Sequence, residues 1–167
     1  DTLTSITVTR TGTGVDADVA ASGVKLWDDS TGTTPNEWDA SDTQLGAGAT
    51  FAAGTATIGG LSAAISTSAK QYLITYNIAA GASNGVTLLG ALTTAVVSNT
   101  LVNNDTTDAT LTVNTTTTVG DGVAPANKNV LQSSTNNAVS AFTLVTSAGA
   151  DTLTSITVTR TGTGVDA

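Results

Sequence analysis

Alternation of apolar and polar residues runs through much of the chain and predicts β-strands. In residues 2–9, Thr alternates with apolar side chains, so that Ile6 and Val8 share one face of an extended segment, and Gly12 ends the run. A period of two residues is typical of a strand with one buried face. Residues 2–9 are therefore predicted to form a half-buried strand.

The clearest alternation lies in residues 72–78, where both tyrosines and both isoleucines fall on one face of an extended chain. We expect this strand to be central in its sheet. Residues 139–146 are apolar on both faces, and we expect them to lie in the interior. Residues 86–97 form one long strand or two, because Gly90 permits a bulge. Shorter runs predict strands at 23–27, 55–58, 61–65 and 109–113 and around Leu45 and Phe51.

The first 17 residues of the chain occur twice. Residues 1–17 return without a single change as residues 151–167, which gives a period of 151 − 1 = 150 residues. Exact duplication over this length is typical of proteins assembled from repeated modules. A period of 150 residues also falls at the ordinary size of one domain. The repeat therefore predicts an architectural role before it predicts any chemistry.

Residues 119–129 have the pattern of a linker, because Gly120, Gly122 and Pro125 interrupt any periodicity. A boundary here leaves residues 1–122 as a module that lacks its own first strands. Residues 130–167 are then the first strands of the next module. On this interpretation, another copy must supply the strand that corresponds to 130–147, whether or not it is covalently joined. We expect that residues 1–122 do not close a complete sandwich alone.

Composition agrees with the strand pattern. Thr makes up about a fifth of the chain and, with Val and Ile, favours pleated sheets over helices. Seventeen Gly and two Pro provide frequent turns, and a hydrophobic content of 40% is enough for a buried core. The predicted fold class is all-β.

The order of several motifs resembles a known family. A strand at Val24–Asp29 runs into an acidic loop that ends at Asp42–Gly46, a small hairpin follows at residues 49–58, and a tyrosine-bearing strand lies at residues 72–79. This order resembles the immunoglobulin-like module that is common in long repetitive surface proteins of bacteria and archaea. The resemblance covers about residues 1–97 together with 130–167. It implies an immunoglobulin-like β-sandwich, tandemly repeated, with a structural and extracellular role.

The acidic loop is the best candidate for ion binding. Calcium prefers several oxygen ligands from a flexible loop, and this loop holds five of the thirteen acidic residues. In the resembling modules, the corresponding loop often has a sequence like a calcium-binding Asp-x-Asn-x-Asn-Gly run. The alternative is a solvated loop, because the acids do not alternate regularly and Pro35 interrupts them. The candidate calcium ligands are Asp28, Asp29, Asp39 and Asp42.

Other chemistry is largely excluded by what the sequence lacks. The absence of Cys, His and Met removes thiol nucleophiles, imidazole bases and soft metal ligands, so we do not expect an enzyme. The net charge is −8 with only five basic residues, which excludes a nucleic-acid partner. No run reaches 18 apolar residues, so we expect no membrane span. Apart from calcium, no cofactor is predicted.

Two features leave a glycan partner open. Trp27 and Trp38 flank the acidic loop, where they either stack on sugars or pack against the protein itself. Asn104 and Asn114 begin sequences that satisfy the N-glycosylation rule, although a Thr-rich chain produces such matches easily.

The sequence therefore predicts a structural subunit or repeat of an extracellular filament or cell-surface layer. Its β-sandwich modules are expected to assemble through strand sharing or through tandem covalent linkage, and its partners are copies of itself in a linear or helical polymer. The alternative function is an adhesin stalk or a carbohydrate-binding module.

Overall fold

A computed structural model describes residues 1–163, and these residues form an all-β structure of antiparallel sheets, as the sequence predicted. Short 3-10 turns at Asp16–Asp18 (η1) and Asp29–Thr31 (η2) are the only helical elements among them. None of the described helices is long and apolar enough to cross a membrane. The chain divides into two compact units, Asp1–Asn114 and a second that begins at Thr115.

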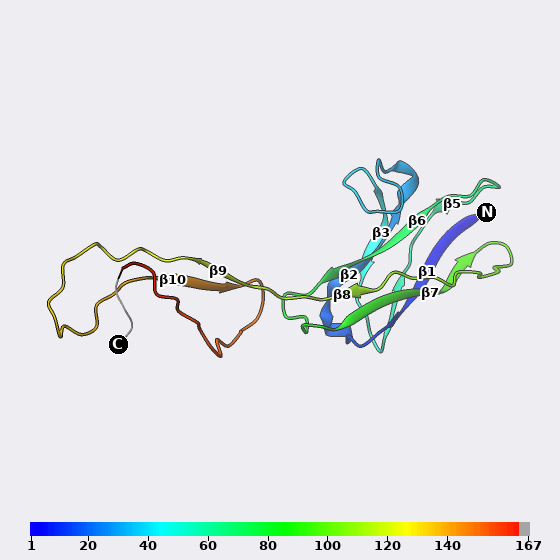
Figure 1. Cartoon of the computed structure of the whole chain (residues 1–167). Helices are drawn as coiled ribbons and strands as arrows, with labels where there is room; N and C mark the ends of the chain where they lie inside the picture. The colour runs from blue at the N-terminus through cyan, green and yellow to red at the C-terminus, as the bar shows by residue number, and fades with distance from the viewer. Residues whose placement is uncertain (164–167) are drawn as a thin grey trace. The chain divides into compact units, whose positions relative to one another are not determined.

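The first sheet is built around β1 (Thr2–Thr11), which lies beside β7 (Thr87–Val97) in Figure 1. On its other side, β1 pairs with β4 (Thr55–Ile58) and with the short β5 (Ala63–Ala64), and β8 (Leu111–Thr112) extends the sheet beyond β7. All of these pairings are antiparallel. The alternation seen in the sequence therefore belongs to an interior strand of the sheet.

The second sheet contains β3 (Thr43–Ala49), β2 (Val19–Asp28) and β6 (Tyr72–Ile78), in the order β3-β2-β6. The central strand is β2, so the expectation that residues 72–78 form a central strand is wrong. Their alternation reports an apolar face, on which Tyr72, Ile74 and Tyr76 are half-buried against the core, and does not report the number of neighbouring strands. β7, which follows β6 along the chain, pairs with β1 in the other sheet and leaves β6 at an edge.

The two sheets share one hydrophobic core. β1 contributes Ile6 and Val8, whose side chains are 3% and 0% exposed. β2 contributes Val24, which is 0% exposed. The Phe51 ring meets the Tyr76 ring edge-on, with their centroids 5.3 Å apart. The remaining buried hydrophobic residues are Leu3, Val19, Leu26, Ala56, Ile58, Leu61 and Leu88.

Residues 86–97 form one strand, and its irregularity lies at Thr93 and not at Gly90. The ladder between β1 and β7 changes register twice, which leaves Thr4 on β1 and Thr93 on β7 as extra residues. Gly90 has a different role, because a Cβ at this position would collide with the hydroxyl oxygen of Tyr76. The glycine therefore makes room for an aromatic residue from the facing sheet.

The second unit contains a two-stranded antiparallel ribbon of β9 (Thr117–Asp121) and β10 (Phe142–Thr146). The expectation that residues 139–146 lie in the interior is wrong for this chain, since Val139 is 87% exposed and Phe142 is 50% exposed. The physical reason is that β10 pairs only with β9 among the described residues, and a ribbon of two strands has no second layer to bury its side chains.

The predicted linker, residues 119–129, begins inside β9 and continues through residues without regular secondary structure. The predicted boundary at residue 122 thus lies within the second unit, and the module assignment stays a prediction. Residues 151–163 form no strand, although the same sequence forms β1 at the start of the chain. The last four residues of the duplicated segment, 164–167, lie outside the described residues.

Candidate functional site

The acidic loop joins β2 to β3 and lies at the end of these strands, where Figure 1 shows it projecting from the sheet. It carries the four predicted calcium ligands. Asp28, Asp29 and Asp42 are only 6%, 7% and 8% exposed, and Asp39 is half-buried. The loop therefore folds around its carboxylates and does not present them to solvent, so each charge needs a partner inside the protein.

Asp28 is neutralised by the protein. Its Oδ2 lies 2.6 Å from Nζ of Lys70, and its Oδ1 accepts hydrogen bonds from the backbone nitrogen and the hydroxyl of Ser30 at 3.2 and 2.5 Å. Burial acts to raise the pKa of Asp28, but the bonds from Lys70 and Ser30 together hold this pKa below its ordinary value. Both carboxylate oxygens of Asp28 are thus occupied by protein partners, and its role is structural.

Asp39 organises the loop. Its Oδ2 accepts hydrogen bonds from the backbone nitrogens of Thr33 and Thr34 at 2.7 and 2.8 Å and from the Thr33 hydroxyl at 2.9 Å. Its Oδ1 accepts from the backbone nitrogen of Ser41 at 2.7 Å and from the Ser41 hydroxyl. The bonds from Ser41 contribute most to holding the pKa of Asp39 far below its ordinary value. Both carboxylate oxygens of Asp39 are occupied by protein donors.

Asp29 and Asp42 each keep one unsatisfied oxygen. Oδ2 of Asp29 accepts from the backbone nitrogen of Asn36 at 3.0 Å, and Oδ2 of Asp42 accepts from that of Asp39 at 2.9 Å. The Oδ1 atoms of Asp29 and Asp42 are buried and have no hydrogen-bond partner. A Cβ at Gly32 would collide with Oδ1 of Asp42, so this glycine allows the carboxylate to approach the backbone closely.

Of the four predicted calcium ligands, only Asp29 and Asp42 therefore have a carboxylate oxygen that no protein donor occupies. Within residues 1–163, no group of three or more metal-ligating side chains is gathered in one place. The Oδ1 atoms of Asp29 and Asp42 are the two carboxylate oxygens of the predicted set that are buried without a hydrogen-bond donor, and carboxylate oxygens are ligands that calcium accepts. The sequence does not distinguish Asp29 and Asp42 from Asp28 and Asp39. The difference lies in the hydrogen-bond donors that surround each carboxylate, and these donors are brought together only when the loop folds. Calcium binding stays a prediction.

The two tryptophans pack on each other beside this loop. Their ring centroids lie 5.5 Å apart, with the planes tilted by 59°. Trp27 is half-buried and donates its Nε1–H to the Thr75 hydroxyl at 2.7 Å, whereas Trp38 is 53% exposed. Trp27 thus anchors the loop to the sheet, and the ring of Trp38 remains available to solvent on one side.

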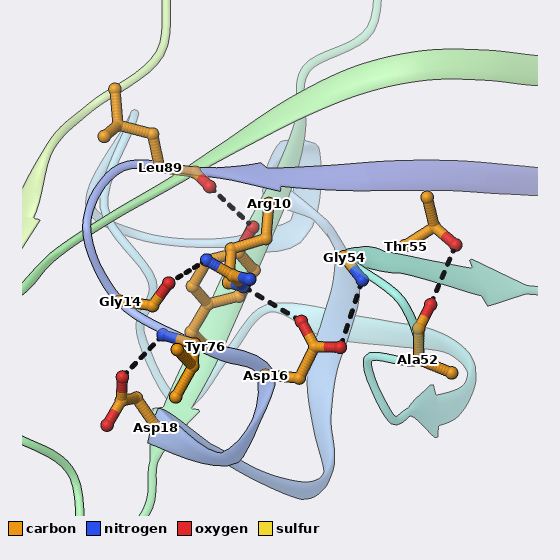
Figure 2. A network of polar contacts seen from close by, with 10 residues as sticks. Arg10, Gly14, Asp16, Asp18, Ala52, Gly54, Thr55, Tyr76 and Leu89 are labelled. Carbon is orange, nitrogen blue, oxygen red and sulfur yellow. Dashed lines mark hydrogen bonds and ion pairs between the residues drawn. The ribbon is translucent and has the colours of Figure 1, made fainter.

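A second polar network, which no sequence motif predicted, lies at the opposite end of β2 (Figure 2). Nε of Arg10 donates to Oδ1 of Asp16 at 3.0 Å, and the guanidinium also donates to the Gly14 carbonyl. The Oδ2 of Asp16 accepts from the backbone nitrogen of Gly54 at 3.0 Å. These bonds connect the β1–β2 turn to the turn before β4.

Asp18 completes this network and is 3% exposed. Its two carboxylate oxygens accept hydrogen bonds from the backbone nitrogens of Val15 and Ser83 at 2.7 and 2.8 Å. These bonds, with that from Val15 the largest contribution, hold the pKa of Asp18 below its ordinary value. The network is structural, because every acceptor in it already has a donor from the backbone or from Arg10.

The first unit also contains an apolar groove of about 570 Å³. β6 of one sheet and β7 of the other form its walls, and residues 101–111 border it. The hydroxyl of Tyr72 is buried at this groove without a hydrogen-bond partner. Burial raises the pKa of Tyr76 to about 12, so its hydroxyl stays protonated and donates to the Leu89 carbonyl at 3.2 Å. No sequence motif pointed to these residues as a site.

Comparison of the chain with protein-family models, with curated proteins and with solved structures finds no match.

Proposed function

We propose that this chain is a structural repeat of an extracellular filament or cell-surface layer, built from immunoglobulin-like β-sandwich modules that join through shared strands or tandem linkage. The observation that carries the proposal is the exact duplication of residues 1–17 at a distance of 150 residues. The first copy forms β1, an interior strand of the larger sheet. A second copy of an interior strand has a use only where a second module is built around it.

The arrangement of the sheets supports a module of this kind. The two sheets of the first unit bury one common core, which is how the layers of a β-sandwich are held together. The acidic composition and the lack of His and Cys agree with a mechanical role at a cell surface. Calcium at Asp29 and Asp42 would stiffen the β2–β3 loop, and the two unsatisfied carboxylate oxygens support that addition.

A second candidate function is glycan binding by an adhesin stalk or carbohydrate-binding module. It is supported by the exposed ring of Trp38, which lies against Trp27 at the end of the sheet. Binding of the chain to a glycan array, with loss of that binding in Trp38→Ala, would favour this function. Retained binding in Trp38→Ala would reject the tryptophan surface as its source.

Electron microscopy of the purified chain tests the main proposal. We expect filaments with an axial repeat of about 30–40 Å, because strands of about ten residues rise roughly 3.3 Å per residue. If the native material consists of single chains of this size, a small closed oligomer or a stable monomer at high concentration would contradict the proposal. A denaturing gel of the native material then separates the two modes of assembly, since only a tandem array gives a species far larger than this chain.

A further inference from the structure

The apolar groove has the features of an unfilled strand position. It lies between β6 and β7, which belong to different sheets, and its walls include Ile74, Leu88 and Leu92. β6 is an edge strand of its sheet within the described residues. An edge strand presents a row of unpaired backbone donors and acceptors, which is a template for a further strand.

The edge of β7 is also incompletely paired. β8 pairs with β7 only at Thr87 and Leu88, so the rest of β7 has a strand partner on one side only among residues 1–163. Beyond that pairing, the side chain of Asn103 donates to the Leu92 carbonyl at 2.8 Å. A side chain in an irregular segment thus occupies a backbone acceptor that a neighbouring strand would otherwise use.

The same chain carries an apolar strand with nothing to cover it. Residues 129–150 contain no charged residue, and β10 places Phe142 and Leu144 on one face, where they are 50% and 40% exposed. Val145 on the other face is 66% exposed. An uncharged strand with apolar residues on both faces suits a position between two sheets, because no charge must be desolvated there.

The lengths of the groove and of β10 agree. Along β6 the groove is lined by each residue from Tyr72 to Ile74 and again by Tyr76, a stretch of five residues. β10 also has five residues, which corresponds to about 17 Å of extended chain. The buried hydroxyl of Tyr72 at the groove has no hydrogen-bond partner in the first unit, so a polar group of the strand that fills the groove would satisfy it.

The repeat indicates where such a strand comes from. Only residues 147–150 separate β10 from the second copy of the β1 sequence. Leu3 of β1 lines the groove of the first unit. Its copy in the repeated segment is Leu153, which would line the corresponding groove of a module built around residues 151–167. A connection of four residues is an ordinary length between neighbouring strands. β10 is thus attached beside the groove of the module that follows it.

We propose that residues 139–146 of one copy of this chain fill the groove between β6 and β7 of another copy and pair with the edge of β6. Phe142 and Leu144 enter the apolar groove. Residues 101–111, which border the groove, are displaced by the incoming strand or pack over it. This inference rests on the proposed function, since it names the surface through which the modules join. A head-to-tail contact of this kind uses two different surfaces, and it extends into a filament when successive contacts do not close into a ring.

Cross-linking between two single-cysteine variants tests the proposal, and the natural chain has no cysteine to interfere. Leu92→Cys places a thiol in the groove, and Phe142→Cys places one on β10. After the two variants are mixed and treated with a short bismaleimide, we expect a dimer joined through positions 92 and 142, identified by mass spectrometry of the linked peptides. The matched control replaces Phe142→Cys with Val123→Cys, at a site that is 94% exposed and outside β10.

The result is read against the control and against microscopy of the unaltered chain. Equal cross-linking with Val123→Cys, or no link between 92 and 142, would overturn the groove as the joining surface. If the chain still forms filaments in that case, the proposed function stands without this inference. If it forms none and the native material consists of single chains of this size, both fail. Specific cross-linking without filaments would support the groove and contradict the proposed function. When it is added to the Phe142→Cys variant, Leu144→Glu should abolish the cross-link that Leu144→Val retains, with unchanged circular dichroism in both.

Discussion

At the scale of single residues, buried aspartates hold the loops of the first unit together. Asp18 and Asp39 each accept several hydrogen bonds from backbone donors, and Asp28 is paired with Lys70. None of these partners follows from the spacing of acids in the sequence. The acidic cluster was visible in the sequence, but the separation into satisfied and unsatisfied carboxylates required the folded loop.

Asp18→Asn should lower the free energy of unfolding at pH 7 by about 1–3 kcal/mol, because one of the two backbone donors then faces an amide NH₂ group. The pKa of Asp18 is lowered in the folded state. Its contribution to stability is therefore present above the unfolded pKa of about 3.9 and is lost as the pH falls through the folded pKa. Urea unfolding of the variant should depend less on pH below about pH 4 than unfolding of the unaltered chain. Asp121→Asn, at an exposed site in β9, is the control.

Calcium should raise the melting temperature of the chain through Asp29 and Asp42. At a concentration of 100 times the dissociation constant, the gain in stability is about 2.7 kcal/mol. Asp42→Asn should remove this gain but should not lower the stability in EDTA, because it neutralises a buried oxygen that has no partner. Differential scanning calorimetry with calcium and with EDTA measures both effects. A melting temperature that calcium does not change would contradict the site.

At the scale of secondary structure, most strands follow from alternation, and their places in the sheets do not. Residues 2–9, 55–58 and 72–78 were predicted as strands and are strands. The order β3-β2-β6 depends on β7 pairing with β1 in the other sheet, which no local pattern specifies. Likewise, the apolar character of residues 139–146 predicts that their burial is favourable, but it does not identify the surface that buries them.

The two copies of the β1 sequence allow a matched test of context. Ile6 is 3% exposed and Ile156 is 58% exposed, although their neighbours in the sequence are identical. Ile6→Ala should cost about 2–5 kcal/mol of stability, because it leaves a cavity in the core. Ile156→Ala should stay within about 0.5 kcal/mol. Since local propensity is the same at both sites, equal losses in chemical denaturation would contradict the assignment of β1 to the core.

At the scale of the whole chain, the segment without regular secondary structure in the second unit should govern proteolysis. Lys128 is exposed in a segment without regular secondary structure, whereas Arg10 and Lys25 lie in β1 and β2. Limited digestion with trypsin should therefore cut after Lys128 before it cuts within the first sheets, and mass spectrometry of the products checks the order. In Lys128→Gln the early fragment should disappear. Early cleavage at Arg10 or Lys25 would show that the first unit is not stably folded.

The sequence by itself determined that this protein is built from strands, that it is acidic, and that its first 17 residues recur 150 residues later, because composition and alternation act locally and a repeated segment is visible in the letters alone. The tertiary structure decided which strands become core. Residues 1–13 and 151–163 have the same sequence, yet only the first copy forms a buried strand. The physical reason is that a strand is stabilised by its neighbours: β4 and β7 pair with the first copy, and no described strand pairs with the second.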